Sequence, residues 1–430
     1  MAKLSSIQEN IRSGKSDALL ARLYGKKPAS LDVQRRRYGR LLDLFASTFP
    51  AAGAIEMFST PGRTEVGGNH TDHNAGRILA AAVNLDVLAV AARNETGIIT
   101  IQSEGYPQAA IDTRQLEVVE AEKYTSAALI RGVCARMQQL GFRVGGFEAC
   151  VTSDVLKGSG ISSSAAFEVL VCTILDHLYN DGNLDPILNA QVSQYAENEY
   201  FDKPCGLMDQ TTCAVGGFVT IDFKDFAHPL VRKIDFDFAA SGYSMVIVDT
   251  GGNHADLTED YAALEHEMKS VAHALGGRVL REFSRQKVLD ETAFLRSQVN
   301  DRAILRALHF YADNQRVADQ VTALETNDFP RFLDLIVESG QSSWMLNQNC
   351  YSPRNVGEQG IPIALEVSKS VLAGRGAWRV HGGGFAGTIQ AFVPGDLLGT
   401  YLSRLGSIFG EKACHEMIIR PVGTTKLDIL

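Results

Sequence analysis

Short runs of apolar, often β-branched residues alternate along the chain with longer stretches in which apolar residues recur every three or four positions. The short runs are typical of strands and the longer stretches of amphipathic helices. Strands are expected at Leu88–Ala92, Gly97–Gln102, Phe218–Phe223 and Ser244–Val248. Helices are expected at Ala165–Tyr179, Asn189–Tyr200, Tyr261–Ala274 and Asp328–Val337. This interleaving predicts a mixed α+β protein.

The length of 430 residues is sufficient for two or three domains. A linker rich in Pro, Gly or Ser is absent from the sequence, but residues 235–242 separate a stretch dense in glycine motifs from a more helical second half. We therefore place a domain division near these residues.

The charge of the chain restricts its partners. A formal net charge of −9 repels phosphate backbones, so we do not expect nucleic acid to be a partner. The one basic cluster, between Lys26 and Arg40, has the spacing of the polar face of a helix. Neither a signal peptide nor an uninterrupted apolar span is evident, which predicts a cytoplasmic protein without a membrane partner. The 7 scattered cysteines form no CxxC pair, so they indicate neither a disulfide framework nor a zinc site.

The first of three segments that carry chemistry, Pro61–Gly76, reads PGRTEVGGNHTDHNAG. Its glycines predict a turn-rich segment, and its many hydrogen-bonding side chains suit a small ligand with several hydroxyl groups. A metal site is an alternative, because His-x-Asp-His resembles part of the HxHxDH signature of metallo-β-lactamase-like hydrolases. That signature needs a further histidine where Gly68 stands. A solvated loop without a ligand is the third possibility.

The second segment, SDVLKGSGISSSAA at 153–166, leads directly into a predicted helix. Backbone N–H groups at a helix N-terminus can hold phosphate oxygens, and serine hydroxyls can contribute to a Mg²⁺ site. The segment matches neither a Walker A loop nor a nucleophile elbow. Helix capping explains one of its three consecutive serines, but not all of them.

The third segment, GRGAWRVHGGGFAG at 374–387, places three consecutive glycines before the strand-like run Thr388–Val393. Such glycines predict the close approach of the backbone to a ligand or to another loop.

Together and in this order, GRTEVGGNHTDH, SDVLKGSGISSSAA, PCGLMDQ and RVHGGGFAG resemble the galactokinases of the GHMP kinase superfamily. The resemblance runs from about Leu31 to the C-terminus. It implies an α+β, two-domain GHMP kinase fold, with a mixed-sheet N-terminal domain like domain 2 of ribosomal protein S5 and an α+β sandwich as C-terminal domain. The active site would lie between the two. The implied division is an N-terminal extension at 1–30, an N-terminal domain at 31–238 and a C-terminal domain at 239–430.

The resemblance also implies the reaction, which is the ATP- and Mg²⁺-dependent phosphorylation of a galactose-like monosaccharide at its anomeric hydroxyl. Asp209 would accept the proton of that hydroxyl, and Arg63 would lie beside it. The implied substrate-binding residues are Asn69, His70, Asp72, Gly206 and Tyr261. The implied ATP-binding residues are Lys157, Gly158, Ser159, Gly160, Ser162, Ser163 and Ser164, and the implied Mg²⁺ ligands are Ser164 and Glu197.

Two departures from the family concern the substrate. Galactokinases read GEHTDY where this chain reads GNHTDH, and GRVN where this chain has Glu65 as the fourth residue. An amide at Asn69 in place of an acid removes a repulsion toward a substrate carboxylate, so galacturonate is an alternative sugar. We expect Asn69→Glu to favour galactose over galacturonate about tenfold with little change in stability. A catalytically silent regulator that binds sugar and ATP is the alternative from another functional class.

Overall fold

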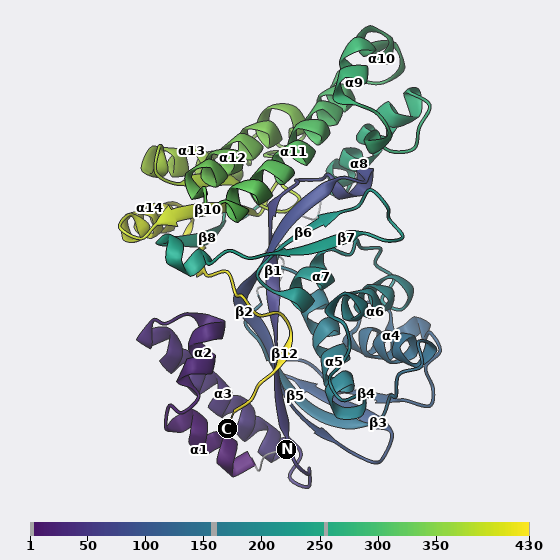
Figure 1. The fold of residues 1–430 in the computed structure, drawn as a ribbon, viewed down its shortest axis with the longest axis vertical. Coiled ribbons are helices and arrows are strands. Elements are labelled where there is room, and N and C mark those ends of the chain that lie inside the picture. The colour runs from purple at the N-terminus through teal and green to yellow at the C-terminus, as the bar shows by residue number, and fades with distance from the viewer. Residues whose placement is uncertain (1–3, 156–160, 253–256, 430) are drawn as a thin grey trace.

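The structure is a computed structural model that describes residues 4–155, 161–252 and 257–429. The molecule has two β-sheets, and in Figure 1 the second, marked by β8 and β10, lies to the left of the upper part of the first. The mixed α+β fold predicted from the sequence is confirmed. The four strands and four helices predicted from periodicity all occur, most with ends that differ by a few residues, but the strand expected at Leu88–Ala92 is only the last part of a strand that begins at Arg77.

The first sheet has eight strands, with β12-β1-β2-β5-β3-β4 as its main path; β6 pairs with the remaining length of β2, and β7 pairs with β6. Its strands are β1 (Glu56–Gly67), β2 (Arg77–Arg93), β3 (Ile98–Ser103), β4 (Ala109–Asp112), β5 (Phe147–Ser153), β6 (Phe218–Asp222), β7 (Leu230–Ile234) and β12 (Thr425–Lys426). Among the described strands, the pair β3 and β5 is parallel and the other pairs are antiparallel.

Helices cover both faces of this sheet, because successive residues of β2 point to opposite sides. Leu88 and Val90 pack against the first three helices, whereas Ala89 and Ala91 belong to the core beneath the next four. The helices of the first group are α1 (Leu4–Arg12), α2 (Asp17–Tyr24) and α3 (Pro28–Thr48). Those of the second are α4 (Ser126–Gln139), α5 (Ser163–Tyr179), α6 (Pro186–Glu199) and α7 (Met208–Val215). The chain thus builds two cores around one central strand.

The second sheet has four antiparallel strands in the order β11-β8-β10-β9. These strands are β8 (Tyr243–Asp249), β9 (Ala377–Val380), β10 (Thr388–Pro394) and β11 (Cys414–Met417). The helices of this half are α8 (Thr258–Ala274), α9 (Arg285–Asp290), α10 (Thr292–Gln298), α11 (Asp301–Glu325), α12 (Phe329–Ser342), α13 (Gly360–Leu372) and α14 (Leu398–Phe409). None of the described helices is both long and apolar enough to span a membrane.

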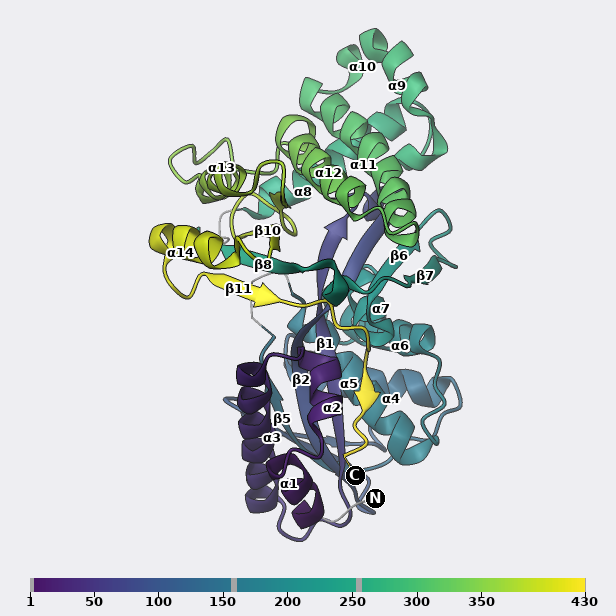
Figure 2. The ribbon, with the colours of Figure 1, turned by 60° about the vertical axis from the view of Figure 1, so that its left-hand side comes forward.

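The chain passes from the first sheet to the second between Ile234 and Tyr243. Figure 2 shows that it later returns, with β11 in the second sheet and β12 beside the first. The strand β12 therefore belongs to the first sheet, although the expected division at 238/239 puts its residues in the second part of the chain.

Two local expectations were wrong. Residues 61–67 are not turns, because they continue β1, which pairs with β2 through two register shifts. Glycine is needed at position 62 for close packing and not for a turn, since a Cβ there would lie 2.8 Å from the side chain of Ile161. Arg37 does not lie on a solvent-exposed helix face, because its guanidinium is buried and forms an ion pair of 2.5 Å with Asp86.

Candidate active site

Arg63 and Asp209 form an ion pair that joins β1 to the first turn of α7. The Nε and Nη2 atoms of Arg63 both lie 2.7 Å from Oδ1 of Asp209. Burial opposes the charge of Arg63, but Asp209 outweighs burial and raises the pKa of the guanidinium above its ordinary value. The side chain of Asp209 keeps 23% of its surface exposed, so its carboxylate is held by protein but can still be reached.

The serine run lies where the sequence places it, at the start of α5. Ser162 is the N-cap, with a positive φ of 60°, and Ser163 is the first residue of the helix. The hydroxyl of Ser162 donates to Oδ2 of Asp209, and the hydroxyl of Ser164 donates to Oε1 of Glu197 at 3.0 Å. Two serines of one run therefore contact two different acids. The remaining predicted ATP-binding residues, 157–160, lie outside the described residues.

Glu197 is almost completely buried on α6, between Ser164 and two further polar side chains. Nζ of Lys203 lies 2.8 Å from Oε1 of Glu197, and Nε2 of Gln210 lies 2.8 Å from Oε2. A serine hydroxyl beside a carboxylate matches the oxygen ligands that Mg²⁺ takes from proteins, usually one or two, with phosphates and water in its other positions. Within the described ranges, no group of three or more His, Cys, Asp and Glu side chains could hold a metal ion. The metallohydrolase alternative therefore finds no support in the described geometry.

Glu168 is a second buried acid at this place, and the sequence reading overlooked it. Its Oε2 lies 3.3 Å from Nε2 of Gln210, and its Oε1 has no hydrogen-bond partner among the described residues. Burial and the neighbouring Glu197 raise the pKa of Glu168 well above its ordinary value. Its spacing of four residues from Ser164 was the available signal, because it puts both side chains on one face of α5.

Four of the five predicted sugar residues, all except Asn69, are at least partly exposed. His70 and Tyr261 reach toward the glycine loop between β9 and β10, with His70 Nε2 lying 3.0 Å from the carbonyl of Gly383. Asp72 and Gly206 line one pocket of about 360 Å³. A Cβ on Gly206 would lie 3.6 Å from Oδ2 of Asp72, so the two residues are in near contact.

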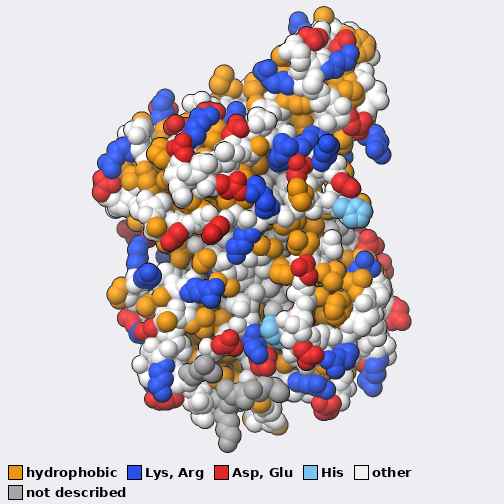
Figure 3. All heavy atoms as spheres, in the orientation of Figure 1, with side chains coloured by type: hydrophobic (Ala, Val, Ile, Leu, Met, Phe, Trp, Pro, Cys, Tyr) orange, Lys and Arg blue, Asp and Glu red, His pale blue; other side chains and the backbone are white. Residues whose placement is uncertain are grey.

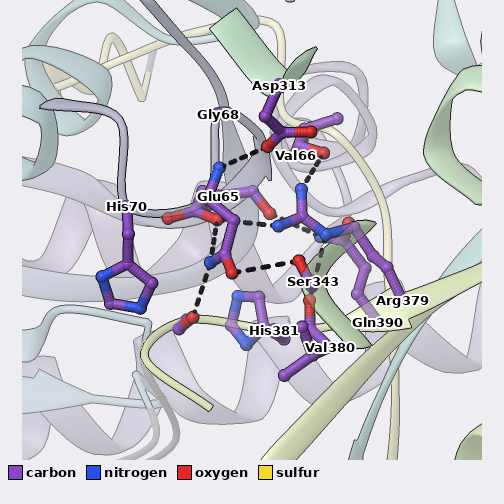
Figure 4. Close-up of polar contacts among 12 residues, drawn as sticks. Glu65, Val66, Gly68, His70, Asp313, Ser343, Arg379, Val380, His381 and Gln390 are labelled. Carbon is purple, nitrogen blue, oxygen red and sulfur yellow. Dashed lines mark hydrogen bonds and ion pairs between the residues drawn. The ribbon is translucent and has the colours of Figure 1, made fainter. Parts of the chain in front are cut away.

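Asn69 does not line that pocket. Its side chain is fully buried, and its Nδ2 atom donates to Oε1 of Glu65 at 3.0 Å and to the carbonyl of Gly382 at 2.9 Å. Its Oδ1 accepts from Nδ2 of Asn349 at 2.9 Å. Figure 4 shows Glu65 beside the guanidinium of Arg379, with which its carboxylate forms an ion pair of 3.0 Å. The expectation that Asn69→Glu leaves stability unchanged is therefore corrected, because it assumed a pocket open to solvent.

Comparison with known proteins agrees with this geometry. The family described as "GHMP kinases N terminal domain" matches residues 128–217, which include the serine run, Glu197 and Asp209. The "Galactokinase galactose-binding signature" matches residues 43–93, which include Arg63 and His70. The chain thus carries the sequence signatures of GHMP kinases and of galactokinases. It is therefore a sugar kinase that transfers phosphate to a hydroxyl group, and kinases of this superfamily take that phosphate from ATP.

Solved structures share the fold of this GHMP kinase over most of its length. Galactokinase from Lactococcus lactis, solved in complex with galactose, is 22% identical and has a TM-score of 0.77, with 91% of this chain and all 100% of that one covered. Mevalonate kinase from Methanococcus jannaschii is 14% identical and has a TM-score of 0.60, with 85% and 99% covered. At these identities the likeness establishes the fold.

Proposed function

We propose that this kinase transfers the γ-phosphoryl group of ATP to the anomeric hydroxyl of a galactose-like monosaccharide. The ion pair of Arg63 with Asp209, which Ser162 contacts at the start of α5, supports this function most directly. It places a carboxylate, a guanidinium and a helix N-terminus at one point. These are the groups that phosphoryl transfer to a hydroxyl requires.

In this proposal Asp209 accepts the proton of the attacking hydroxyl. Arg63 bonds to one oxygen of the carboxylate and Ser162 to the other, which fixes the orientation of the group. Arg63 contacts Oδ1 through two nitrogens, whereas Oδ2 retains a further lone pair that can accept a hydrogen from the sugar. Arg63 favours the ionised acid, and it also stabilises negative charge on the transferred group.

Ser164 and Glu197 are the residues that would hold Mg²⁺. Their oxygens lie 3.0 Å apart at the N-terminal end of α5, where phosphate oxygens are expected. A bound Mg²⁺ would neutralise charge on the β- and γ-phosphates of ATP. Lys203 contacts the same carboxylate at 2.8 Å and would add positive charge beside the phosphates.

For the sugar itself we propose His70, Asp72, Gly206 and Tyr261 as contacts. Galacturonate, the alternative suggested by Asn69, has no remaining support, because the amide of Asn69 bonds to protein on all sides. A silent regulator would be expected to lack Arg63 or Asp209, whereas here the two are present and paired.

The test is an ADP-release assay with Mg²⁺ and ATP over galactose, galacturonate, N-acetylgalactosamine, glucose and arabinose. We expect turnover with galactose or a close neutral relative, and a ³¹P signal coupled to the anomeric proton of the product. Turnover with galacturonate alone, or phosphate at another position, would contradict the proposal.

A further inference from the structure

The segment that carries His70 and Asp72 lies between β1 and β2, at residues 68–76. Asn69 and Thr71 are fully buried, whereas His70 and Asp72, which alternate with them, keep part of their surfaces exposed. The segment therefore turns two of the predicted sugar residues outward and their neighbours inward.

The backbone of this segment has a conformation that local preference alone does not stabilise. His70 has a φ of 60°, in the left-handed region that residues other than glycine rarely adopt. Such a backbone persists only where the surrounding structure holds it. Here the contacts come from α11, a helix of the second half of the chain.

Two side chains of α11 bond the main chain of Asn69, immediately before His70. Oδ2 of Asp313 accepts from the N–H of Asn69 at 2.8 Å (Figure 4). Nε2 of His309 donates to the carbonyl oxygen of Asn69 at 2.9 Å. The two side chains are four positions apart and lie on one face of the helix. Both polar groups of this main chain are thus held by α11.

The two side chains that hold Asn69 are themselves fixed. Asp313 and His309 are fully buried, and Nη1 of Arg316 lies 2.6 Å from Oδ1 of Asp313. A carbonyl can only accept, so Nε2 of His309 carries the hydrogen of its bond. Nδ1 then accepts from the hydroxyl of Ser342 at 2.8 Å. Burial lowers the pKa of His309 below its ordinary value, which favours this neutral form.

The far end of the segment is attached to the same helix. Oδ1 of Asn314 accepts from the N–H of Arg77, the first residue of β2, at 2.9 Å. Gly76 beside it also packs closely on α11, because a Cβ there would lie 3.0 Å from the ring of Phe310. The segment is therefore held by α11 at both ends, with the predicted sugar residues between them.

We propose that His309 and Asp313 are positioning residues, which hold the main chain of Asn69 so that His70 and Asp72 lie where a sugar can reach them. This inference rests on the proposed function, in which those two residues contact the sugar. His309 and Asp313 would not touch the sugar themselves, because both are fully buried. Their loss should therefore weaken sugar binding, while the contacts on α5 and α7 that serve phosphoryl transfer remain.

The first experiment compares His309→Leu with His309→Gln, with galactose as the probe. Leucine cannot donate to the carbonyl of Asn69, whereas the amide of glutamine can. We expect His309→Leu to raise the KM for galactose about tenfold or more and to leave the KM for ATP within about twofold. In His309→Gln the KM for galactose should stay within about threefold of the wild type.

Two results of this comparison would overturn the inference while the proposed function stands. One is an unchanged KM for galactose in a folded, active His309→Leu protein. The other is an equal rise of that KM in His309→Leu and His309→Gln, because it would show that the donated bond is not what matters.

Tyr24→Phe is the control for a loss of stability alone. It removes the bond of 2.6 Å that Tyr24 donates to Oδ2 of Asp86, in the core that α1, α2 and α3 form with the first sheet. We expect a lower Tm and an unchanged KM for galactose. A KM that rises with falling Tm as steeply as in His309→Leu would show that His309 acts through stability alone, and its positioning role would be lost.

The second experiment needs no substrate. Hydrogen exchange followed by mass spectrometry on the full-length protein reports how readily residues 68–77 open. We expect exchange there to become about tenfold faster or more in His309→Leu and in Asp313→Ala, whereas peptides from β3 should match the wild type. Unchanged exchange at 68–77 in both variants would overturn the inference, even if no sugar tested proves to be a substrate.

Ser342→Ala is the milder variant if the other two do not fold. It removes the hydroxyl that bonds Nδ1 of His309 and leaves α11 itself unchanged. The hydrogen of the imidazole is then free to move to Nδ1, from which it cannot reach Asn69. We expect exchange at 68–77 to become about twofold to threefold faster. Exchange equal to that of the wild type would contradict the positioning role.

Discussion

Two acid clusters lie side by side at the start of α5, and each receives one serine of the same run. Asp209 faces a guanidinium and keeps 23% of its side chain exposed. Glu197 and Glu168 are 1% and 0% exposed, and they share the amide of Gln210, while the ammonium group of Lys203 contacts Glu197. The first cluster balances charge one to one at an accessible edge, whereas the second buries two acids together.

The difference indicates two kinds of chemistry. A paired and accessible carboxylate can take a proton from a substrate and return it. Two buried acids at one place cannot both ionise without cost, and here burial and Glu197 raise the pKa of Glu168. The pair of Glu197 and Glu168 is therefore suited to binding an added cation. On the surface, by contrast, Figure 3 shows acidic and basic side chains interspersed over the visible face.

The largest effect on activity is expected from a substitution of Asp209, because it removes the proton-accepting role assigned to the first cluster. Asp209→Asn keeps the shape of the side chain and cannot accept a proton at neutral pH. We expect kcat in the ADP-release assay to fall about 10²–10⁴-fold, with ATP affinity nearly unchanged in a binding titration. A variant with wild-type turnover would remove Asp209 from the mechanism.

Glu197→Gln tests the other cluster. A neutral amide is a poorer ligand for a hard dication than a carboxylate is. We expect the Mg²⁺ concentration for half-maximal activity to rise about tenfold, equivalent to about 1.4 kcal/mol. The same titration on Asp209→Glu, if it retains measurable activity, serves as the control. An unmoved midpoint in Glu197→Gln would contradict the proposed metal site.

Glu168→Gln asks whether the second cluster costs stability in the absence of a cation. The folded-state pKa of Glu168 is raised above its ordinary value of 4.5, so the folded protein retains a proton that the unfolded chain releases. This term disfavours folding increasingly as pH rises above about 4.5. Removing the acid should raise Tm by about 2–4 °C at pH 8 and by less at pH 5. A stabilisation that does not depend on pH would show that the acid carries no such cost.

The smallest effects are expected from substitutions of Ser162 and Ser164. Each substitution should change a different quantity, kcat for Ser162 and the Mg²⁺ midpoint for Ser164. Ser162→Ala removes one contact of Asp209 and should lower kcat about threefold to tenfold at saturating Mg²⁺, equivalent to about 1 kcal/mol. Ser164→Ala removes a contact of Glu197 and should mainly shift the Mg²⁺ midpoint. Equal changes in both quantities for both variants would show that the clusters are not separate.

The sequence predicted elements whose signals are local. The apolar runs located β3 and β6, and the serine run located the start of α5, because pattern and structure coincide there. The segment containing Arg63 was assigned to turns because its glycines were read as turn formers, whereas two of them allow close packing: Gly62 against Ile161 and Gly67 against Gln320. Such contacts join positions far apart in the chain, so no local pattern records them.

For the site residues, too, local motifs could be predicted from the sequence, whereas contacts between distant positions could not. Arg63, Asp209, Ser164 and Glu197 were predicted from collinear motifs, and the structure brings them together in two pairs. The burial of Asn69 could not be predicted, because two of its side-chain partners, Gly382 and Asn349, lie 313 and 280 positions later in the chain, beyond the reach of any spacing argument.

The return of the C-terminal strand to the first sheet has a consequence for the order of folding. β12 pairs with Ser59 of β1, and just before it Arg420 enters the buried cluster of Asp86 and Arg37. During synthesis, the first sheet therefore emerges from the ribosome with one edge open and Asp86 lacking one of its two cations. Only residues 420–426, which follow the whole second sheet in the chain, can complete it, so the first sheet becomes fully native after the second has been made.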